Sequence, residues 1–403
     1  MSVSRLSSPV SSTRSVRLAN ERVVYDVLGL GRPLSAPDLV EATGLSKPTV
    51  GLALARLEEV GLVRQSGRRS GATGRSPRIF ALEASAGGAL AVDVGRHRVR
   101  AARVDLAGAV VGRAESDADG RSARALVDQV LRLAARLCPE ADRGRVSHTV
   151  LGSPGVYDAA ADVIRLAPNL PGWDRPAVLR RLRAGLPGTL LVDNDINLAA
   201  LAELDALESP ADPSPERDAP GPSFVLVSVG TGLGMGIVED GRVLRGARGA
   251  AGEISYLPAD PSPTAGPTRI EELTGSAAIV RAAQDLGLDL PSAQAVFDAA
   301  RHGSPVAAQV VEREAERLAL AVAAVVAVLD PPLVLLGGGI GRNGDLLLEP
   351  LRAHLAARLP LPVPEIRLSR LDVDAPLQGA LVQGVLHARR HAFDAARPAD
   401  AAP

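Results

Sequence analysis

Cysteine, aromatic residues and long apolar runs are scarce in this 403-residue chain, and each scarcity excludes a class of protein. Cys138 is the only cysteine, so the chain can form neither an internal disulfide nor a zinc centre built from several thiolates. Aromatic residues make up 2% of the chain, too few for the stacking platform of a single-strand nucleic-acid binder. No apolar run reaches the roughly 18 residues that cross a bilayer, and residues 1–16 lack the apolar core of a signal peptide. These features predict a cytoplasmic protein with no membrane partner.

The charge of the chain is nearly balanced overall but is divided unevenly along it. The formal net charge is −1, yet residues 1–82 carry 12 basic and 6 acidic side chains, and the remainder carries 33 and 40. A basic segment on an acidic body is typical of a DNA-binding module attached to a domain that does not itself bind DNA. Lys47 is the only lysine, so arginine is the default basic residue here and its abundance alone says little about phosphate binding.

Residues 35–63, SAPDLVEATGLSKPTVGLALARLEEVGLV, predict two helices joined by a tight turn. Gly44 occupies the turn, where a residue without Cβ is suited. Ser46 is placed to cap the second helix, and Pro48 fits the first turn because no intrahelical N–H is needed there. The second helix buries an apolar stripe at spacing i, i+4, i+7, formed by Val50, Leu54 and Leu57. Its first turn is left to contact bases and phosphates of DNA through Ser46, Lys47 and Thr49.

A basic loop follows this helix pair. The segment RQSGRRSGATGRSPRIFAL predicts strand, loop, strand, which is the wing of a winged helix-turn-helix domain. Four arginines in or beside the loop are expected to contact DNA: Arg68, Arg69, Arg75 and Arg78. An ordinary helical hairpin with a solvated charged loop is the alternative. The cap, the basic wing and the charge division favour a DNA-binding domain over 17–82, preceded by a disordered lead over 1–16.

After a short joint, the sequence predicts an α/β protein of two lobes. Strands and helices over 88–205 form the first lobe. The stretch 208–222 is rich in proline and acidic residues without periodicity, which predicts a flexible, solvated loop. Strands and helices then resume in a similar order over 223–375, which predicts a second lobe across a cleft. A last helix at 376–395 is expected to pack back on the first lobe, and residues 396–403 to form a frayed tail.

Three strands of these lobes end in glycine-rich turns. The turns are Asp93-Val94-Gly95, Gly230-Thr231-Gly232-Leu233-Gly234 and Gly337-Gly338-Gly339. Each exposes backbone N–H groups at a strand end, where an anion can sit close. None is a P-loop, and GTGLGMG is followed by a strand, whereas a dinucleotide fingerprint is followed by a helix. Taken alone, each is better explained as a structural turn.

The segment VDNDINLAALAE places polar residues where a strand passes into a helix. Asn194 and Asp195 then lie at the positive end of that helix. There Asp195 can act as the base that takes a proton from a substrate hydroxyl. A pair of helix caps explains the same residues, and this segment by itself does not separate the two interpretations.

Taken in order, these motifs resemble the ROK family, sugar kinases and sugar-responsive repressors with a two-lobed actin-like (ribonuclease H-like) ATPase fold. The N-terminal segment resembles the repressor branch through LSKPTVGLALARLEEVGLV and GRSPR. The body resembles the family through AVDVG, GSPGVYD, NLPGWD, VDNDINLAALAE, VGTGLGMGIVEDGRVLRGARGAAGEI and VLLGGGI. The resemblance covers nearly the whole chain, and the AGE block with the downstream GGG is its most specific part.

The resemblance implies roles for individual residues. Asn194, Asp195, Glu253 and Glu271 correspond to sugar-binding positions, with the adjacent Glu272 as the alternative to Glu271. Asp195 corresponds to the catalytic base of the kinases. The nucleotide-binding positions of the family correspond to Asp93, Gly95, Thr231, Gly232, Gly338 and Gly339.

The chain departs from the family pattern at three points. Where the family has a histidine three residues after the AGE glutamate, this chain has Tyr256, which either takes that place in the sugar pocket or packs. The following loop contains no cysteine, so the structural zinc of the family is expected to be lost and no metal or cofactor to be bound. The kinases show Asp-x-Gly-Gly-Thr in the first nucleotide turn, whereas Arg96 and His97 follow Gly95 here. Because phosphotransfer depends on positioning and electrostatics, ATP and Mg²⁺ are expected only if kinase activity survives.

The sequence therefore predicts a transcriptional regulator, a repressor, whose body senses a sugar or sugar derivative. A homodimer or a dimer of dimers is expected to bind a palindromic double-stranded operator, because one head alone offers modest affinity. The main alternative is an ATP-dependent sugar kinase that carries a DNA-binding head. A regulator that has lost its ligand and responds to a protein partner is a third interpretation.

Overall fold

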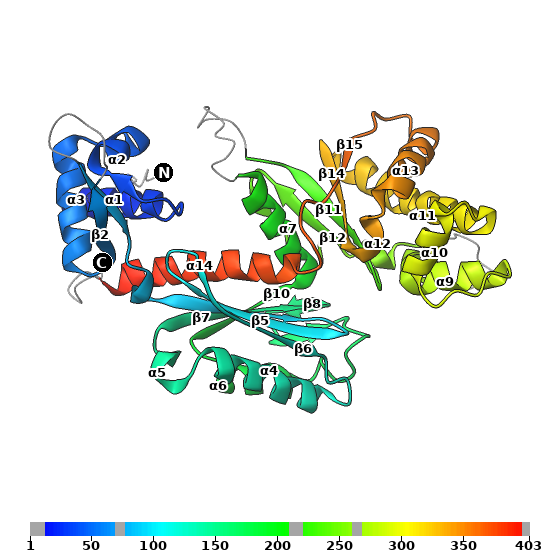
Figure 1. Cartoon of the computed structure of the whole chain (residues 1–403), viewed down its shortest axis with the longest axis horizontal. Helices are drawn as coiled ribbons and strands as arrows, with labels where there is room; N and C mark the ends of the chain where they lie inside the picture. Colours follow the sequence, from blue (N-terminus) through cyan, green and yellow to red (C-terminus); the bar gives the residue numbers. More distant parts are fainter. Residues whose placement is uncertain (1–12, 69–76, 209–220, 260–267, 397–403) are drawn as a thin grey trace, which may run out of the picture.

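A computed structural model describes residues 13–68, 77–208, 221–259 and 268–396. It has three parts: an N-terminal head (blue in Figure 1), a first lobe (cyan to green) and a second lobe (green to orange). The predicted lead and tail lie mostly outside the described residues, as does most of the predicted 208–222 loop. Within the described ranges, no helix has both the length and the apolarity needed to cross a bilayer.

The head, residues 13–82, is a winged helix-turn-helix domain. Its elements are α1 (Thr13–Leu28), β1 (Leu34–Ser35), α2 (Ala36–Thr43), α3 (Lys47–Glu59), β2 (Val63–Arg68) and β3 (Arg78–Leu82). The strands pair antiparallel in the order β1-β3-β2. Gly44 ends α2 with φ at 69°, and the Ser46 side chain accepts a hydrogen bond from the Thr49 N–H at the start of α3. The predicted turn and cap therefore both form.

The first lobe is built on a five-stranded sheet of order β10-β7-β4-β5-β6. Its strands are β4 (Gly88–Val94), β5 (Arg98–Asp105), β6 (Val110–Asp117), β7 (Val146–Ser153) and β10 (Thr189–Asn194), with a side hairpin of β8 (Val156–Asp158) and β9 (Val163–Arg165). Helices α4 (Ala123–Leu137), α5 (Glu140–Arg143) and α6 (Pro176–Gly185) lie along one face of the sheet in Figure 1. The apolar side chains between them enclose Trp173, the only tryptophan of the chain, which is 1% exposed.

The second lobe repeats this plan with a sheet of order β13-β12-β11-β14-β15. Its strands are β11 (Phe224–Val229), β12 (Leu233–Glu239), β13 (Arg242–Val243), β14 (Leu333–Gly337) and β15 (Glu365–Leu368). Its helices are α8 (Ile270–Leu273), α9 (Ser276–Asp285), α10 (Ala293–Arg301), α11 (Pro305–Leu329), α12 (Gly338–Gly341) and α13 (Gly344–Arg358). The large core between the sheet and α11 is mostly aliphatic, with Phe297 fully buried in it, so burial of aliphatic surface supplies most of the stability of this lobe. The α/β two-lobed fold with a winged-helix head is the predicted one.

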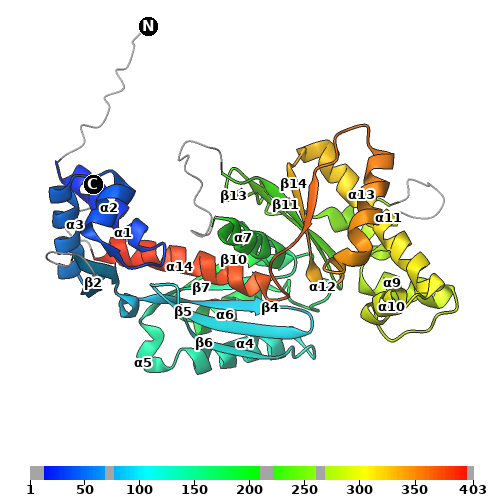
Figure 2. The ribbon, with the colours of Figure 1, turned by 45° about the horizontal axis from the view of Figure 1, so that its top comes forward.

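Two helices lie between the two sheets, α7 (Asp195–Leu207) and α14 (Ala375–Ala395), as Figure 2 shows. Residues of α7 pack on the second-lobe sheet around Phe224 and Leu226, whereas Leu198 of the same helix packs with Leu377 of α14 on the first lobe. The two helices cross very closely: a Cβ at Gly379 would lie 1.7 Å from the carbonyl oxygen of Leu198. The two helices are therefore in direct contact, with no room for a side chain at their crossing point.

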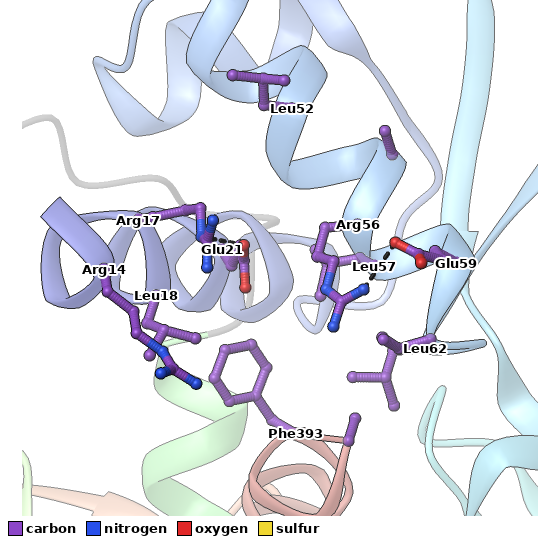
Figure 3. Close-up of a pocket in the computed structure, with 13 residues that line it drawn as sticks. Arg14, Arg17, Leu18, Glu21, Leu52, Arg56, Leu57, Glu59, Leu62 and Phe393 are labelled. Carbon is purple, nitrogen blue, oxygen red and sulfur yellow. Dashed lines mark hydrogen bonds and ion pairs between the residues drawn. The ribbon is translucent and has the colours of Figure 1, made fainter. Parts of the chain in front are cut away.

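Helix α14 continues from the body into the head. Its middle section packs Val385 and Ala388 against Leu106 of the first lobe. Phe393, near its end, is 6% exposed and belongs to the core of the head, with its ring centroid 5.4 Å from that of Tyr25. Figure 3 shows Phe393 facing α1 and α3, beside an open groove of about 470 Å³. The core of the head is thus completed by the far end of the chain.

Candidate DNA-binding and effector sites

The start of α3 is open to solvent, as contact with DNA requires. Ser46, Lys47 and Pro48 are exposed and Thr49 is half-buried. The hydroxyl groups of Ser46 and Thr49 lie 2.8 Å apart and the cap holds both in place. The opposite side of α3 is buried through Val50, Ala53, Leu54 and Leu57. This helix can present its first turn to a major groove without losing its packing.

The wing places two of its four predicted arginines at the mouth of the loop. Arg68 ends β2 and Arg78 begins β3, the two residues pair across the strands, and both are exposed. The guanidinium of Arg78 lies over the Phe80 ring at 5.6 Å, which orients it without neutralising its charge. Arg69 and Arg75 lie outside the described residues. The wing strands therefore bring positive charge to one end of the hairpin.

Replacing Arg68 with alanine is expected to reduce the salt dependence of DNA binding. An arginine that contacts a phosphate displaces about one counterion, so the slope of log Kd against log salt should fall by about one unit. Lys47→Ala should weaken binding as well, and Arg136→Ala, on an exposed position of α4, serves as the control of equal charge change. Fluorescence anisotropy on labelled duplex across a salt series measures both slopes. Equal slopes for Arg68→Ala and wild type would show that the wing does not contact the backbone.

A second candidate site is an acidic cluster formed by Asp93, Asp195, Glu253 and Glu271, together with Tyr256. Asp93 lies near the end of β4 and Asp195 begins α7. Glu253 precedes the 3₁₀ turn Ile254–Tyr256, Tyr256 ends that turn, and Glu271 lies in α8. The electrostatic interactions link them: Asp195 is influenced by Asp93 and Glu253, and Glu253 by Glu271. The fold thus brings together carboxylates that are separated by almost 180 positions in the sequence.

Burial and mutual repulsion change the acidity of this cluster. Burial, then the charges of Asp93 and Glu253, raise the pKa of Asp195 to about 7. Burial and the charge of Glu271 raise the pKa of Glu253, and burial followed by Glu253 and Glu271 raises that of Tyr256. Carboxylates crowded in this way are stabilised by partners that donate hydrogen bonds, and a ring of sugar hydroxyls supplies such donors.

Asn194 caps α7, and Asp195, the first residue of the helix and a member of the acidic cluster, also accepts a hydrogen bond from its first turn. The Asn194 side-chain oxygen accepts from the N–H groups of Ile196 and Asn197, and its Nδ2 donates to the Gly155 carbonyl at 3.0 Å. Asp195 accepts from the Ile196 N–H at 3.0 Å. The two interpretations of this segment, cap and ligand, are therefore compatible, because capping fixes the side chains in place.

The structure distinguishes Glu271 from its neighbour. Glu271 is half-buried and Glu272 is exposed. A Cβ at Gly232 would lie 2.7 Å from Glu271 Oε1, so the absence of a side chain at Gly232 makes room for this carboxylate. Tyr256 lies within the same electrostatic group, and the Arg269 guanidinium covers its ring at 4.9 Å. The chain thus places Glu271 and Tyr256 beside Glu253.

The two glycine-rich turns of the second lobe lie side by side. Strands β11 and β14 are parallel neighbours, with Ser228 opposite Gly337, so the turns that follow them meet at one edge. A Cβ at Gly230 would lie 3.9 Å from the Gly339 nitrogen, and Gly339 itself is exposed with open space around it. Gly338 has φ at 79°, and a Cβ there would lie 2.3 Å from the Val229 carbonyl. Thr231 is exposed and Gly232 half-buried at the same edge.

The glycine-rich turn after β4 differs, because its aspartate, Asp93, forms an ion pair with Arg100. This arginine was not identified from the sequence. Arg100 lies opposite Asp93 across β4 and β5 and its Nη1 donates to Asp93 Oδ2 at 3.1 Å. Burial raises the pKa of Asp93 to about 6, against the lowering effect of Arg100. Gly95, half-buried, donates its N–H to the Arg98 carbonyl, and Arg96 and His97 are exposed at the hairpin tip. Arg100 could have been identified from the sequence, because a short hairpin turn between β4 and β5 sets the strand register and places Arg100 opposite Asp93.

One cysteine is available in this chain as a ligand for a structural zinc. Cys138 is buried at the end of α4, in the first lobe. Within the described ranges, no three His, Cys, Asp or Glu residues are arranged to hold a metal ion. Part of the loop that carries the zinc ligands in the family, residues 260–267, lies outside the described residues.

Replacing Asp195 with asparagine is expected to make the protein less sensitive to rising pH. The raised pKa means that the folded state binds the Asp195 proton more tightly than the unfolded chain does. Stability from this proton is present at low pH and is lost as the pH rises towards about 7. Asparagine keeps the oxygen that accepts from Ile196 and carries no charge. From about pH 5 to about pH 8, the free energy of unfolding of the wild type should therefore fall by on the order of 2 kcal/mol relative to that of Asp195→Asn. Urea unfolding of both proteins at both pH values measures this change. The same stability difference between variant and wild type at the two pH values would contradict a raised pKa for the Asp195 carboxyl.

Comparison with known proteins agrees with this architecture. The model of the ROK family matches residues 89–383, and the model of the IclR helix-turn-helix domain matches residues 27–67. A glucokinase from Halalkalibacterium halodurans is 30% identical over 72% of this chain and 92% of its own length. A xylose repressor from Caldicellulosiruptor bescii is 22% identical over 84% of this chain and 88% of its own length.

A solved structure extends the likeness to the fold as a whole. The crystal structure of a ROK family transcriptional regulator, a homolog of the E. coli MLC protein, superposes with a TM-score of 0.71 at 22% identity. It covers 94% of this chain and 97% of that one, head included. With two lobes, an acidic cluster at the start of α7 and a family model matched over most of its length, the chain belongs to the ROK family.

Proposed function

We propose that this chain is a DNA-binding transcriptional regulator, acting as a repressor, whose ROK body senses a sugar or sugar derivative. The observation that carries the proposal is the junction of a winged helix-turn-helix head and a ROK body, in which helix α14 of the body places Phe393 in the core of the head. The similarity to the xylose repressor extends over a larger share of this chain than the similarity to the glucokinase does. A kinase has no need of the head.

The acidic cluster supports a carbohydrate as the effector. Asp195, Glu253 and Glu271 offer carboxylate oxygens that accept hydrogen bonds from hydroxyl groups, and Asn194 adds an amide. Asn194 and Asp195 begin α7, which contacts both lobes and α14. An effector held at the start of α7 would favour one arrangement of the lobes, and its influence on DNA affinity is limited by its differential affinity for the two arrangements.

The assembly proposed for DNA binding is a homodimer, or a dimer of dimers, on a palindromic operator. A single α3 with one wing contacts a short stretch of duplex, and two heads at fixed spacing multiply both affinity and discrimination. The basic charge of residues 1–82 supports the head, and not the acidic body, as the part that meets the duplex.

Anisotropy titration of the full-length protein against the DNA upstream of its own gene tests the proposal. Specific binding should exceed binding to competitor duplex by at least about a thousandfold. A panel of xylose, glucose and N-acetylmannosamine, with their phosphates, should contain a compound that changes the Kd, and Asp195→Asn should lose that change. Binding without preference for any duplex would refute the repressor, and a response to none of the sugars would refute the sensor.

A sugar kinase is the second candidate, and Asp195 is the observation that favours it. A carboxyl with a pKa of about 7 at a helix start is suited to take a proton from a sugar hydroxyl. Two observations argue against a kinase. The Arg100 guanidinium forms an ion pair with the Asp93 carboxylate, and Arg96 and His97 replace the small residues of the kinase turn. A coupled assay of ADP release across the same sugars separates the two candidates, because turnover that Asp195→Asn abolishes would establish the kinase.

A further inference from the structure

Arg389 of α14 occupies the point where the head, the first lobe and α7 meet. Its Nε donates to the Leu106 carbonyl at 2.7 Å, which attaches the side chain to the end of the first-lobe sheet. Arg389 lies one turn before Phe393, the residue that enters the core of the head. The side chain is partly buried, unlike that of the next residue, Arg390, which is exposed.

Two glycines shape the space for the Arg389 guanidinium. A Cβ at Gly29, just after α1 in the head, would lie 3.2 Å from Nη1 of Arg389. A Cβ at Gly108, in the turn between β5 and β6, would lie 3.5 Å from Nη2. The planar group therefore has the head on one side and the first lobe on the other, and a side chain at Gly29 would displace it.

Charged groups from three parts of the protein face this guanidinium. Burial lowers the pKa of Arg389, and interactions with the Tyr25 phenol and with Asp105, Asp26 and Asp205 act against that lowering. Tyr25 and Asp26 belong to α1 of the head, Asp105 to β5 and Asp205 to α7. An arginine remains charged in such surroundings, so the attraction to all three parts is permanent.

We propose that Arg389 is the positioning residue that holds the head in one orientation on the body, so that a displacement of α14 turns the head as a rigid unit. Burial of Phe393 is non-directional and does not by itself fix the orientation of the head. The planar Arg389 guanidinium does so through its hydrogen bond to the Leu106 carbonyl and its fit between Gly29 and Gly108. The proposal rests on the proposed function only for its consequence in DNA binding.

Distance measurement between head and body tests the proposal without DNA or sugar. Spin labels at Gln65→Cys on β2 and Arg136→Cys on α4 are both at exposed positions, and the native Cys138 is 1% exposed. With the labelled chain diluted in an excess of unlabelled protein, so that each assembly carries one labelled chain, double electron–electron resonance should give one narrow distance for the otherwise unchanged protein. In Arg389→Met, which keeps the apolar stem and loses the fork, the distribution should broaden about twofold or split. Arg390→Ala should leave it narrow.

Equal, narrow distributions in wild type and Arg389→Met would overturn the proposal, and so would equal broadening in Arg390→Ala. Trp173 fluorescence and circular dichroism establish that each variant is folded. If Arg389→Met does not fold, Arg389→Lys, which keeps the charge but not the fork, is judged by the same criterion.

The consequence for DNA binding is measured separately. Operator affinity of Arg389→Met should fall about tenfold, because two heads with free orientation no longer match two half-sites. Absence of operator binding by the wild-type protein would refute the proposed function and leave the distance result to decide on Arg389. Wild-type operator affinity in Arg389→Met would count against the positioning role.

Discussion

Replacing Phe393 with alanine is expected to unfold the head at a temperature at which the two-lobed body remains folded. Phe393 is 6% exposed and packs against the head around Tyr25, and the Arg22 guanidinium lies over its ring at 5.1 Å. Loss of a buried phenylalanine removes apolar burial and leaves a cavity, at a cost of about 3–5 kcal/mol. A small domain has little stability to spare.

The only tryptophan of the chain makes this prediction measurable. Trp173 is buried in the first lobe, so its fluorescence reports the body, whereas far-ultraviolet circular dichroism reports head and body together. In Phe393→Ala the circular dichroism signal should lose a helical component at a lower temperature, while the Trp173 transition keeps its midpoint. Leu386→Ala, on the same helix at a side chain that is 55% exposed, is the control. A shift of both transitions together would mean that the head does not unfold independently.

Replacing Gly379 with alanine is expected to separate α14 from α7 and to destabilise the body strongly. The added Cβ would lie 1.7 Å from the Leu198 carbonyl oxygen and 2.4 Å from its carbonyl carbon, and both are backbone atoms that no side-chain rotation can move. Overpacking of a core costs about 1–3 kcal/mol, and a backbone clash of this size should reach or exceed the upper value. The same change should weaken any effect of a sugar on DNA binding, because α7 and α14 no longer move together.

A second glycine of the chain provides the matched control. Gly51 lies within α3, and a Cβ at that position would meet no atom within 4 Å. Gly51→Ala should therefore stabilise the helix by about 0.5–1 kcal/mol, through the reduced freedom of the unfolded chain. Urea unfolding followed by Trp173 fluorescence and circular dichroism compares the two variants. A stability of Gly379→Ala within about 1 kcal/mol of wild type would show that the two helices do not cross this closely.

The proposed effector site and the head are related in the structure by a short series of contacts. Asn194 and Asp195 begin α7, Leu198 of α7 touches α14, and α14 ends in the head at Phe393. Each step is a contact between rigid elements, so a displacement at one end has few ways to be absorbed along the path. The two variants above interrupt this series at two different points.

Features that depend on neighbouring residues could be predicted from the sequence. The turn at Gly44, the cap at Ser46 and the buried stripe of α3 all arise within about one dozen residues, where periodicity and capping preferences act directly. The strand-to-helix passage at Asn194 is local in the same sense. The family resemblance added the two-lobed fold and the pairing of a DNA-binding head with a sugar-kinase-like body, which composition alone does not reveal.

Tertiary structure alone decided which distant residues share a site. Glu271 and Glu272 are adjacent in the sequence, and the fold half-buries Glu271 against Gly232 while it leaves Glu272 exposed. Arg100 became visible only through the strand register that sets it opposite Asp93, and Phe393 only through the path of α14 into the head. The physical reason is that local preferences are fixed by backbone sterics and nearby hydrogen bonds, whereas burial and charge pairing depend on which surfaces meet once the chain has folded.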